Sequence, residues 1–495
     1  MLLLGIDIGT SSVKVTVVDA ATQTGIASAQ YPDTESPILV PEPGWAEQSP
    51  DMWWQQLHHA IQLCNNSGTY NPHDISAIGI AYQMHGLVLV DKNQHVLRNS
   101  IIWCDSRAVE IGDKAFTAIG EKKCLSHLLN SPGNFTASKL AWVKQNEPAV
   151  YDQIDKIMLP GDFIAMKLSG DITTSVSALS EGIFYDFKND QLSSDVLKYF
   201  GFSKSLFPSV KPVFSNHGTL SRSVAEKLRL KAGIPITYKA GDQPNNALSL
   251  NVLNPGEVAA TAGTSGVIYG VSDKLAYDPQ SRVNTFAHVN YTEKQKRLGI
   301  LLCINGTGRL YSWAKNVFGS SVSYSQMNEK AAESPMGCYG LRILPFGNGT
   351  ERMLNNKPIS AHIHNIDLNI HDQSHVFRAV QEGIACAFRY GLDIMRENGM
   401  NPSVIRAGRA NLFLSDLFAS TFVNATGVPV ELYHNDGSTG AALGAGIGSG
   451  IFTSPAEAFS NMQKMKVVEP SGNKFEPVYQ DWKNLLETQL QKNNQ

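Results

Sequence analysis

Two segments of the chain share one pattern: an apolar strand, a turn of glycine and hydroxyl residues, and a second apolar strand. The first covers residues 2–19 with its turn at residues 9–12, and the second covers residues 257–270 with its turn at residues 263–265. Short apolar runs separated by such a turn predict β-hairpins. Because the pattern occurs twice, we expect a fold built from two related halves.

The turns of both predicted hairpins are suited to phosphate. Glycine lets an anion approach the backbone, and turn N–H groups with small hydroxyls can surround phosphate oxygens. The first hairpin also carries Asp7, a single acid in an otherwise apolar strand. Magnesium prefers one or two carboxylates together with phosphate and water, so Asp7 predicts a magnesium site. An ordinary hairpin with a solvated Asp7 is the alternative for this segment alone.

Composition narrows the classes of partner. Neither hairpin matches the P-loop or the dinucleotide fingerprint. The net charge of −3, from 41 basic and 44 acidic residues, gives no reason to expect nucleic acid or a membrane as partner, so a small molecule is favoured. The six cysteines are widely spaced without a C-x-x-C pair, which argues against a zinc ribbon or a disulfide framework. With no signal peptide and no long apolar run, we expect a cytoplasmic protein.

A chain of 495 residues is long enough for several domains. We place a boundary between residues 1–246 and 247–495, where a short apolar piece precedes the second hairpin. Strands such as Ile75 to Ala81 alternate with helices such as residues 51–61, whose Trp53, Leu57 and Ile61 share one face. This alternation predicts an α/β fold.

Four further segments carry candidate chemistry. Asp242 follows the predicted strand 236–240 and can face a cleft, although helix capping is the alternative. The strands 86–91 and 100–103 are expected to bring Met84, His85 and Asp105 together.

Two more of these segments follow in the second half. A glycine turn at 407–411 leads into a helix and can pack against a purine ring, or it is a simple loop. The small residues at 440–446 favour a helix in close packing.

The order of these motifs resembles that of the FGGY carbohydrate kinases, within the sugar kinase, actin and Hsp70 superfamily. The resemblance extends from residue 2 to about residue 450 and includes the stretches Gln-Met-His-Gly at 83–86 and Trp-Cys-Asp-Ser-Arg at 103–107. These two stretches are similar to the subgroup that phosphorylates xylulose. The resemblance implies two ribonuclease-H-like domains with the active site in the cleft between them, and ATP-dependent phosphorylation of D-xylulose to D-xylulose 5-phosphate with Mg²⁺. A homodimer is a further expectation of the same kind.

The resemblance also assigns roles to individual residues. Asp242 is expected to be the general base, and Asp7 and Asp242 are expected to hold the magnesium ion. The ketose pocket is expected to contain Met84, His85, Asp105 and Gln243. The residues expected to bind the nucleotide are Gly9, Thr10, Ser11, Ser12, Lys14, Gly263, Thr264 and Ser265 at the phosphates and Gly408, Arg409 and Asn411 at the adenine.

Two departures from the family pattern concern the site. Gln243 stands where Asn usually follows the base, and the usual triple glycine at the adenine is replaced by Ala407, Gly408 and Arg409. The alternatives to a xylulose kinase are a kinase for another ketose or polyol, such as ribulose, an ATPase of the actin or Hsp70 type without sugar chemistry, and a catalytically inactive sugar sensor.

Overall fold

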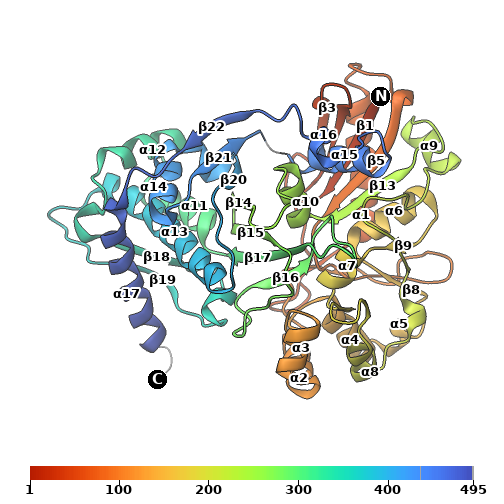
Figure 1. Cartoon of the computed structure of the whole chain (residues 1–495), viewed down its shortest axis with the longest axis horizontal. Coiled ribbons are helices and arrows are strands. Elements are labelled where there is room, and N and C mark those ends of the chain that lie inside the picture. Colours follow the sequence, from red (N-terminus) through yellow and green to blue (C-terminus); the bar gives the residue numbers. More distant parts are fainter. Residues whose placement is uncertain (435, 493–495) are drawn as a thin grey trace.

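The computed structural model describes residues 1–434 and 436–492, and Asn435, which precedes the predicted small-residue helix, lies outside them. Two sheets with helices packed against them form the two halves of the molecule (Figure 1). The first half is drawn in red to yellow-green and the second mainly in green to blue. The predicted α/β class is confirmed.

The first sheet has five strands, and its central strand is β1. β1 pairs in parallel with β5 and antiparallel with β2, and β13 extends the parallel side. In spatial order the strands are β3 (Thr24–Tyr31), β2 (Val13–Asp19), β1 (Leu2–Ile8), β5 (Ile75–Tyr82) and β13 (Ile236–Gly241).

The second sheet repeats this order at its centre. β14 pairs antiparallel with β15 and in parallel with β20, and β21 extends the parallel side. Its strands are, in spatial order, β16 (Asn284–Ala287), β17 (Leu298–Ile304), β15 (Gly266–Ser272), β14 (Val258–Ala262), β20 (Ile405–Gly408), β21 (Val430–Tyr433) and β22 (Lys464–Val468). Both predicted hairpins are therefore confirmed, and the two halves share one topology.

Helix α1 (Pro50–Asn65) covers one face of the first sheet through β2 and β3. Ser49 caps it by accepting a hydrogen bond from the N–H of Met52, and Pro50 occupies the first turn, where its missing N–H costs nothing. Trp53 and Leu57 are fully buried in this layer, as their one-turn spacing predicts. Helices α6 (Pro160–Ser169) and α9 (Arg222–Leu228) lie beside α1.

Helix α15 (Gly437–Gly448) crosses from the second half of the chain to the first sheet (Figure 1). It packs on β1 and β5 so closely that a Cβ on Gly5 would lie 1.7 Å from the carbonyl oxygen of Ser438. The small residues predicted to serve close packing do so. Helix α10 (Asp242–Ser249) packs on α15 and spans the proposed division at residues 246 and 247, so the domain boundary stays a prediction.

The remaining long helices surround the second sheet. The longest, α13 (Gln373–Glu397), is buried along most of one face and contacts a helix or strand on each side. Its neighbours are β15, β17, α11 (Thr307–Phe318), α12 (Tyr324–Glu333), α14 (Asp416–Thr426), α17 (Glu476–Lys492) and β18 (Arg342–Phe346), and β18 pairs with β19 (Ser360–His364). The glycine turn predicted to open a helix differs, because Gly408 ends β20 and a short turn at Asn411–Leu414 precedes α14.

The part of the chain between β5 and β13 forms short helices and two-stranded ladders. The predicted strands at 86–91 and 100–103 are shorter than expected, and β6 (Val88–Val90) pairs with β8 (Lys156–Met158), whereas β7 (Ser100–Ile101) pairs with β4 (Glu47–Gln48). A single bridge joins Leu87 to Ile101. The helices of this region are α2 (Val109–Ile119), α3 (Glu121–His127), α4 (Thr136–Asn146), α5 (Pro148–Tyr151), α7 (Val176–Glu181) and α8 (Ser194–Phe200).

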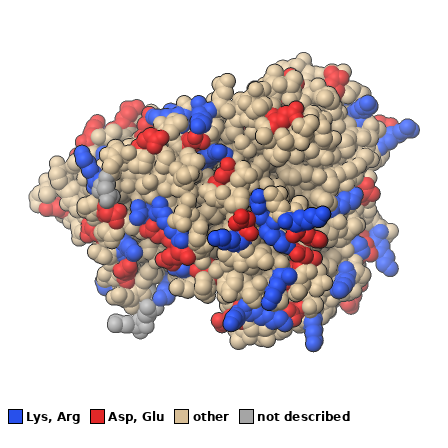
Figure 2. Space-filling view, viewed as in Figure 1, with Lys and Arg blue, Asp and Glu red and all other residues tan. Residues whose placement is uncertain are grey.

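Basic and acidic side chains are interspersed on the face shown in Figure 2. This mixture agrees with the small net charge of −3. None of the helices in the described ranges has the length and apolar character that a membrane crossing requires.

Candidate active site

Asp7 and Asp242 lie at the same edge of the first sheet. Asp7 is the penultimate residue of β1, and Asp242 begins α10 directly after β13. β1 and β13 are parallel to β5, and their last residues both pair with Tyr82. The carboxyl ends of the parallel strands therefore bring together two acids that are 235 residues apart in the chain.

The pKa values of these two carboxyl groups show that they influence each other. Burial raises the pKa of Asp242 to about 7, with the negative charge of Asp7 as the second cause. Burial likewise raises the pKa of Asp7 to about 6; the charge of Asp436 adds to this shift and Lys14 opposes it. Two desolvated carboxylates that repel each other form a site that favours a cation or a proton donor.

The start of α15 completes the surroundings of Asp7. Lys14 pairs with Asp7 across the hairpin and forms an ion pair with Asp436, whose side chain caps α15. A Cβ on Gly437 would lie 2.2 Å from a carboxylate oxygen of Asp7, so a side chain there would displace this carboxylate. Asn245 of α10 donates a hydrogen bond to the carbonyl of Gly437 at 2.9 Å, which links the two helices beside the acid.

The turn of the first hairpin is held by a network of side chains. The N–H of Gly9 donates to the carbonyl of Ser12 at 3.0 Å. The hydroxyl of Thr10 donates to Gln83 at 3.1 Å and accepts from the indole of Trp103 at 3.0 Å. Ser11 is exposed, and Ser12 is half-buried. The turn is thus rigid, with Ser11 at its surface.

The turn of the second hairpin rests on the first residues of α11. The N–H groups of Gly308 and Arg309 donate to the carbonyls of Gly263 and Thr264 at 3.0 and 3.2 Å. A Cβ on Gly308 would lie 2.3 Å from the Gly263 oxygen, so glycine is needed for this approach. Thr264 is exposed and Ser265 half-buried.

A cavity of about 640 Å³ opens beside this second turn. Its wall includes Gly263, Thr264 and Asn411, three of the residues predicted to bind the nucleotide, and also Arg309 and Tyr311. Gly408 and Arg409 are absent from the described residues that line it. The Arg409 guanidinium instead lies 3.8 Å from the carboxylate of Asp416.

His85 is held by residue 181 at two points. The His85 N–H donates to Oε1 of Glu181 at 3.1 Å, and the ring Nδ1 donates to the Glu181 carbonyl at 3.0 Å. Burial lowers the pKa of His85 to about 3, with Lys139 as the second cause, so the ring is neutral. Its Nδ1 carries the proton, and Nε2 is therefore a hydrogen-bond acceptor. The backbone of His85 has a positive φ of 62°, which is uncommon outside glycine.

Met84 and Gln243 lie next to Asp242. A Cβ on Gly241 would lie 2.6 Å from Cγ of Met84, which places this side chain against the strand end. Gln243 lowers the pKa of Asp242 through its N–H and its side chain, against the effect of burial. Its Oε1 is buried, and no group in the described part of the chain forms a hydrogen bond with it. The orphaned oxygen is thus available to a bound ligand.

Asp105 is engaged by protein groups. It is fully buried and accepts hydrogen bonds from the Arg107 guanidinium at 2.7 to 3.0 Å and from the N–H of Ala46 at 2.5 Å. Lys139 donates to the carbonyls of His85 and Ile102 at 3.0 and 2.9 Å, so the predicted proximity of these two segments is present. A contact between Asp105 and substrate stays a prediction.

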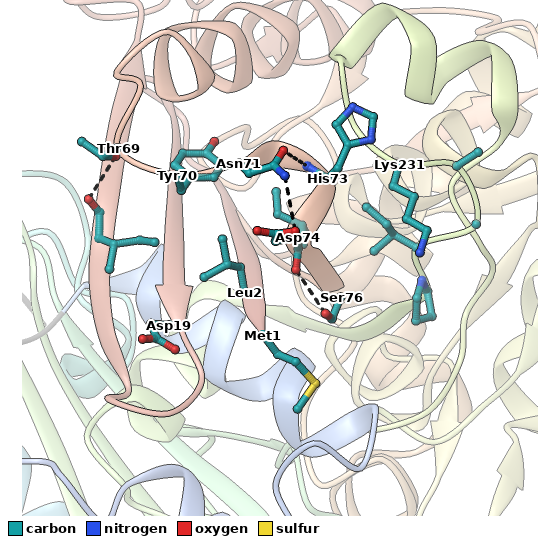
Figure 3. A pocket seen from close by; sticks show the side chains of 16 residues that line it. Met1, Leu2, Asp19, Thr69, Tyr70, Asn71, His73, Asp74, Ser76 and Lys231 are labelled. Carbon is teal, nitrogen blue, oxygen red and sulfur yellow. Dashed lines mark hydrogen bonds between the residues drawn. The ribbon is translucent and has the colours of Figure 1, made fainter.

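A cavity of about 780 Å³ lies at the opposite end of the first sheet (Figure 3). It is lined by the starts of β1 and β5, including Met1 and Ile75, and by Asp19 and Asp74. Asp7 and Asp242 are at the other ends of these strands, so this cavity is separate from the acid pair.

Comparison with known proteins identifies the family. The model of the FGGY family of carbohydrate kinases, N-terminal domain, matches residues 2–249. The chain belongs to the FGGY family of carbohydrate kinases. It is therefore a carbohydrate kinase, which uses ATP to phosphorylate a sugar.

The relatives of this FGGY kinase span nearly its whole length. It is 28% identical to a xylulose kinase of Escherichia coli over 94% of this chain and 93% of the relative, and 28% identical to one of Bacillus subtilis over 92% and 90%. A solved structure of xylulose kinase from Rhodospirillum rubrum superposes with a TM-score of 0.88 at 24% identity, covering all of both chains. Glycerol kinase of Plasmodium falciparum with ADP has the same TM-score at 21% identity, covering 99% and 98%. The predicted two-domain fold of the sugar kinase and actin superfamily is thereby confirmed.

The acid pair of the FGGY kinase fits a magnesium ion. Carboxylate oxygens are the protein ligands that this ion prefers, and it usually takes only one or two of them, with waters and phosphate completing its shell. Asp7 and Asp242 supply such a pair, and burial raises the pKa of both carboxyl groups although Lys14 opposes the shift at Asp7. Within residues 1–434 and 436–492, no group of three or more His, Cys, Asp or Glu side chains forms a denser metal site.

Several residues near the site were not found from the sequence. Glu181 ends α7 in a segment without a phosphate or sugar motif, and Asp436 and Gly437 reach Asp7 only through the path of α15. Arg309 had a local signal, because Asn-Gly-Thr-Gly at 305–308 precedes it and opens a helix. Glycine followed by a helix start is a pattern that accompanies phosphate binding.

Proposed function

We propose that this kinase phosphorylates a ketopentose at a primary hydroxyl, and that the acceptor is D-xylulose, which becomes D-xylulose 5-phosphate. The observation that carries the proposal is the pair Asp7 and Asp242 at the carboxyl ends of β1 and β13, beside the turn of the first hairpin and the segment after β5 that carries His85. The relatives named xylulose kinase, at 28% identity over more than nine-tenths of the chain, support the choice of sugar.

Asp242 serves as the general base. Its pKa of about 7 places it close to physiological pH, where a base combines a usable fraction of ionised form with a strong tendency to accept a proton. Asp242 takes the proton of the acceptor hydroxyl, the hydroxyl oxygen bonds to the γ-phosphorus of ATP, and the bond from that phosphorus to the ADP oxygen breaks. Phosphoryl transfer depends mainly on alignment and charge neutralisation, so this set of groups is sufficient.

The other residues bind and orient the two substrates. Asp7, with Asp242 beside it, would hold Mg²⁺, which supplies positive charge to the phosphate oxygens when it is bound. The turns at residues 9–12 and 263–265 would contact phosphates through N–H groups and hydroxyls. Nε2 of His85 accepts a hydrogen bond from a sugar hydroxyl, and Oε1 of Gln243 accepts another.

Three assignments take the local geometry into account. Asn411 is proposed to contact the adenine or ribose, since it lines the cavity beside the second turn. For Gly408 and Arg409, we propose a supporting role at the end of β20, where the Arg409 N–H donates to the carbonyl of Tyr433 at 2.8 Å. Lys14 is proposed to orient Asp436 and to lower the charge around Asp7.

The proposal is tested by ADP release with ATP and Mg²⁺ across D-xylulose, D-ribulose, L-xylulose, L-ribulose, glycerol and no acceptor. We expect strong stimulation by D-xylulose and weak stimulation by the others. If another acceptor gives a larger kcat/KM than D-xylulose, that acceptor is the substrate and the proposed sugar is wrong. Equal ADP release with and without every acceptor would contradict it.

A further inference from the structure

We propose that Glu181 is a specificity-determining residue of the acceptor pocket, and that its Oε2 contacts a sugar hydroxyl next to the one that is phosphorylated. This inference rests on the proposed function of the Asp242 site. It adds a residue at the end of helix α7 to a pocket otherwise formed by the strand ends and the segment after β5.

The position of Glu181 between two site residues is the first argument. Its Oε1 accepts from the N–H of His85 at 3.1 Å, which directs the carboxyl group toward the acceptor side of the cleft. Its Oε2 lies 2.8 Å from the place where a Cβ on Gly241 would stand, directly before Asp242 in the chain. The carboxyl group thus spans the space from the sugar-recognising histidine to the base.

The unpaired state of Oε2 is the second argument. Glu181 is fully buried, and Oε2 has no hydrogen-bond partner among the described residues. A buried carboxyl oxygen without a partner carries the full cost of desolvation, so such atoms are rare unless a ligand completes them. Oε1 of Gln243, the residue that follows the base, is likewise buried without a hydrogen-bond partner among the described residues. Two unpaired oxygens next to one base are a set of acceptors suited to a polyol.

The chemistry of the pocket favours a neutral ligand with several hydroxyls. Burial raises the pKa of Glu181 well above its usual value; the charges of Asp242 and Asp162 add to this shift, and the N–H of His85 and the ammonium of Lys139 oppose it. Nε2 of His85 accepts only, whereas a carboxyl group offers two oxygens in fixed positions. An acceptor with adjacent hydroxyl groups can satisfy His85 and Glu181 at once, and an acceptor that lacks one of them leaves a buried oxygen unpaired.

Substitutions of Glu181 can distinguish two roles: positioning His85 through Oε1 and contacting the sugar through Oε2. Glu181→Gln keeps an oxygen for the His85 N–H and replaces the second oxygen by an amide NH₂, whereas Glu181→Ala removes both. If Glu181 only positioned His85, the glutamine variant would behave as the wild type. If Oε2 contacts the sugar, both variants lose acceptor recognition.

The experiment measures KM and kcat for the acceptor and for ATP in the wild type, Glu181→Gln and Glu181→Ala, with D-xylulose and its 1-deoxy, 3-deoxy and 4-deoxy analogues. We expect acceptor KM to rise about tenfold or more in both variants, as for loss of a hydrogen bond to a buried group, with KM for ATP within about twofold. For the 4-deoxy analogue, which lacks the hydroxyl next to the phosphorylated one, the wild type should already show this loss and Glu181→Gln should add nothing to it.

Two results would overturn the inference while leaving the proposed function intact. One is an acceptor KM for Glu181→Gln equal to that of the wild type, and the other is an equal further loss with every deoxy analogue. A wild type without sugar-stimulated ADP release would remove the proposed function, and this inference with it. Circular dichroism and thermal unfolding of both variants show whether a loss comes from misfolding. If Glu181→Ala is misfolded, the comparison of Glu181→Gln with the wild type tests the inference.

Discussion

The two halves of the molecule have the same strand order and the same hairpin, but they carry different charges at the corresponding place. Asp7 and Lys14 face each other in the penultimate pair of the first hairpin, whereas Thr261 and Val267 occupy that pair in the second. In the first sheet, β13 lies beside β5 and leads to Asp242. In the second sheet, β21 lies beside β20 and leads to the exposed His434. One fold unit therefore appears twice, once with Asp7 and Asp242 at the compared places and once with Thr261 and His434 there.

The difference extends to packing. Gly5 in β1 corresponds to Ala259 in β14, because each lies two residues before the compared pair. α15 lies directly on Gly5, where a side chain would meet the backbone of Ser438. The absence of a side chain at Gly5 lets α15 pack directly on β1, and this packing places Gly437 and Asp436 beside Asp7. The comparison indicates that the acid site depends on both halves of the chain.

The largest effect is expected from Asp242→Asn, which makes the end of β13 as neutral as its counterpart. Loss of a general base lowers kcat by about 10²–10⁴-fold, whereas ATP binding should change by less than about twofold. Steady-state kinetics with the preferred sugar and calorimetric titration with ATP measure both. His434→Ala, at the matching place in the second half, is the control and should keep kcat within about twofold. An equal loss in the two variants would remove the distinction between the halves.

A smaller loss is expected from Asp7→Thr, which gives the first hairpin the residue of the second. Without this carboxylate, Mg²⁺ should be bound more weakly, so half-maximal activity should require about tenfold or more additional Mg²⁺. Kinetics at a series of Mg²⁺ concentrations measure the shift. Thr261→Ser is the matched control, and it keeps the neutral hydroxyl. An unchanged Mg²⁺ requirement in Asp7→Thr would show that the ion is held elsewhere.

Gly5→Ala tests the packing difference. The new Cβ meets backbone atoms of α15, which cannot move as a side-chain tip does, so we expect a loss of about 3 kcal/mol in the free energy of unfolding. The reverse exchange in the second half, Ala259→Gly, removes one buried methyl group and should cost about 1 kcal/mol. Urea unfolding of both variants compares them. A smaller loss for Gly5→Ala than for Ala259→Gly would contradict the close contact.

The weakest effect concerns stability and pH. The pKa of Asp242 rises from 3.8 to about 7 on folding, so the folded state binds this proton more tightly than the unfolded state does. Between these values the native state loses stability as pH rises, because the buried carboxyl group must ionise. Asp242→Asn removes this cost and should raise Tm relative to the wild type at about pH 8, but not at about pH 4, in the absence of Mg²⁺. Thermal unfolding at both pH values measures the difference, and an equal change at both would argue against the buried charge.

Local patterns were sufficient for much of the fold. The hairpin around Gly9, the helix that Ser49 caps and the position of Asp242 after a strand were predicted from short stretches, because turn geometry, capping and strand alternation are local. The repeat of the hairpin also predicted two related halves, which both sheets confirm.

Contacts between distant segments were not predictable in the same way. Lys14 and Asp436 are 422 residues apart, and no local pattern indicates that α15 returns to the first sheet. The motif that contains Asp105 gave no sign that Arg107, two residues later, occupies its oxygens. Arg409 lies in a motif expected at the adenine, but the cavity wall is formed by Asn411 and by α11 instead. No sequence motif around Glu181 predicts a place in the site, because its proposed role depends on the contact of α7 with His85.

The most direct test of the account uses phosphorus-31 NMR to follow the reaction of ATP with D-xylulose in the presence of Mg²⁺. The wild type and Asp242→Asn are compared. The account predicts a new sugar monoester signal that grows at the rate of ADP formation in the wild type. In Asp242→Asn this signal should grow at least about 10²-fold more slowly. Formation of ADP and free phosphate without a sugar phosphate, or a sugar phosphate signal unaffected by the substitution, would contradict it.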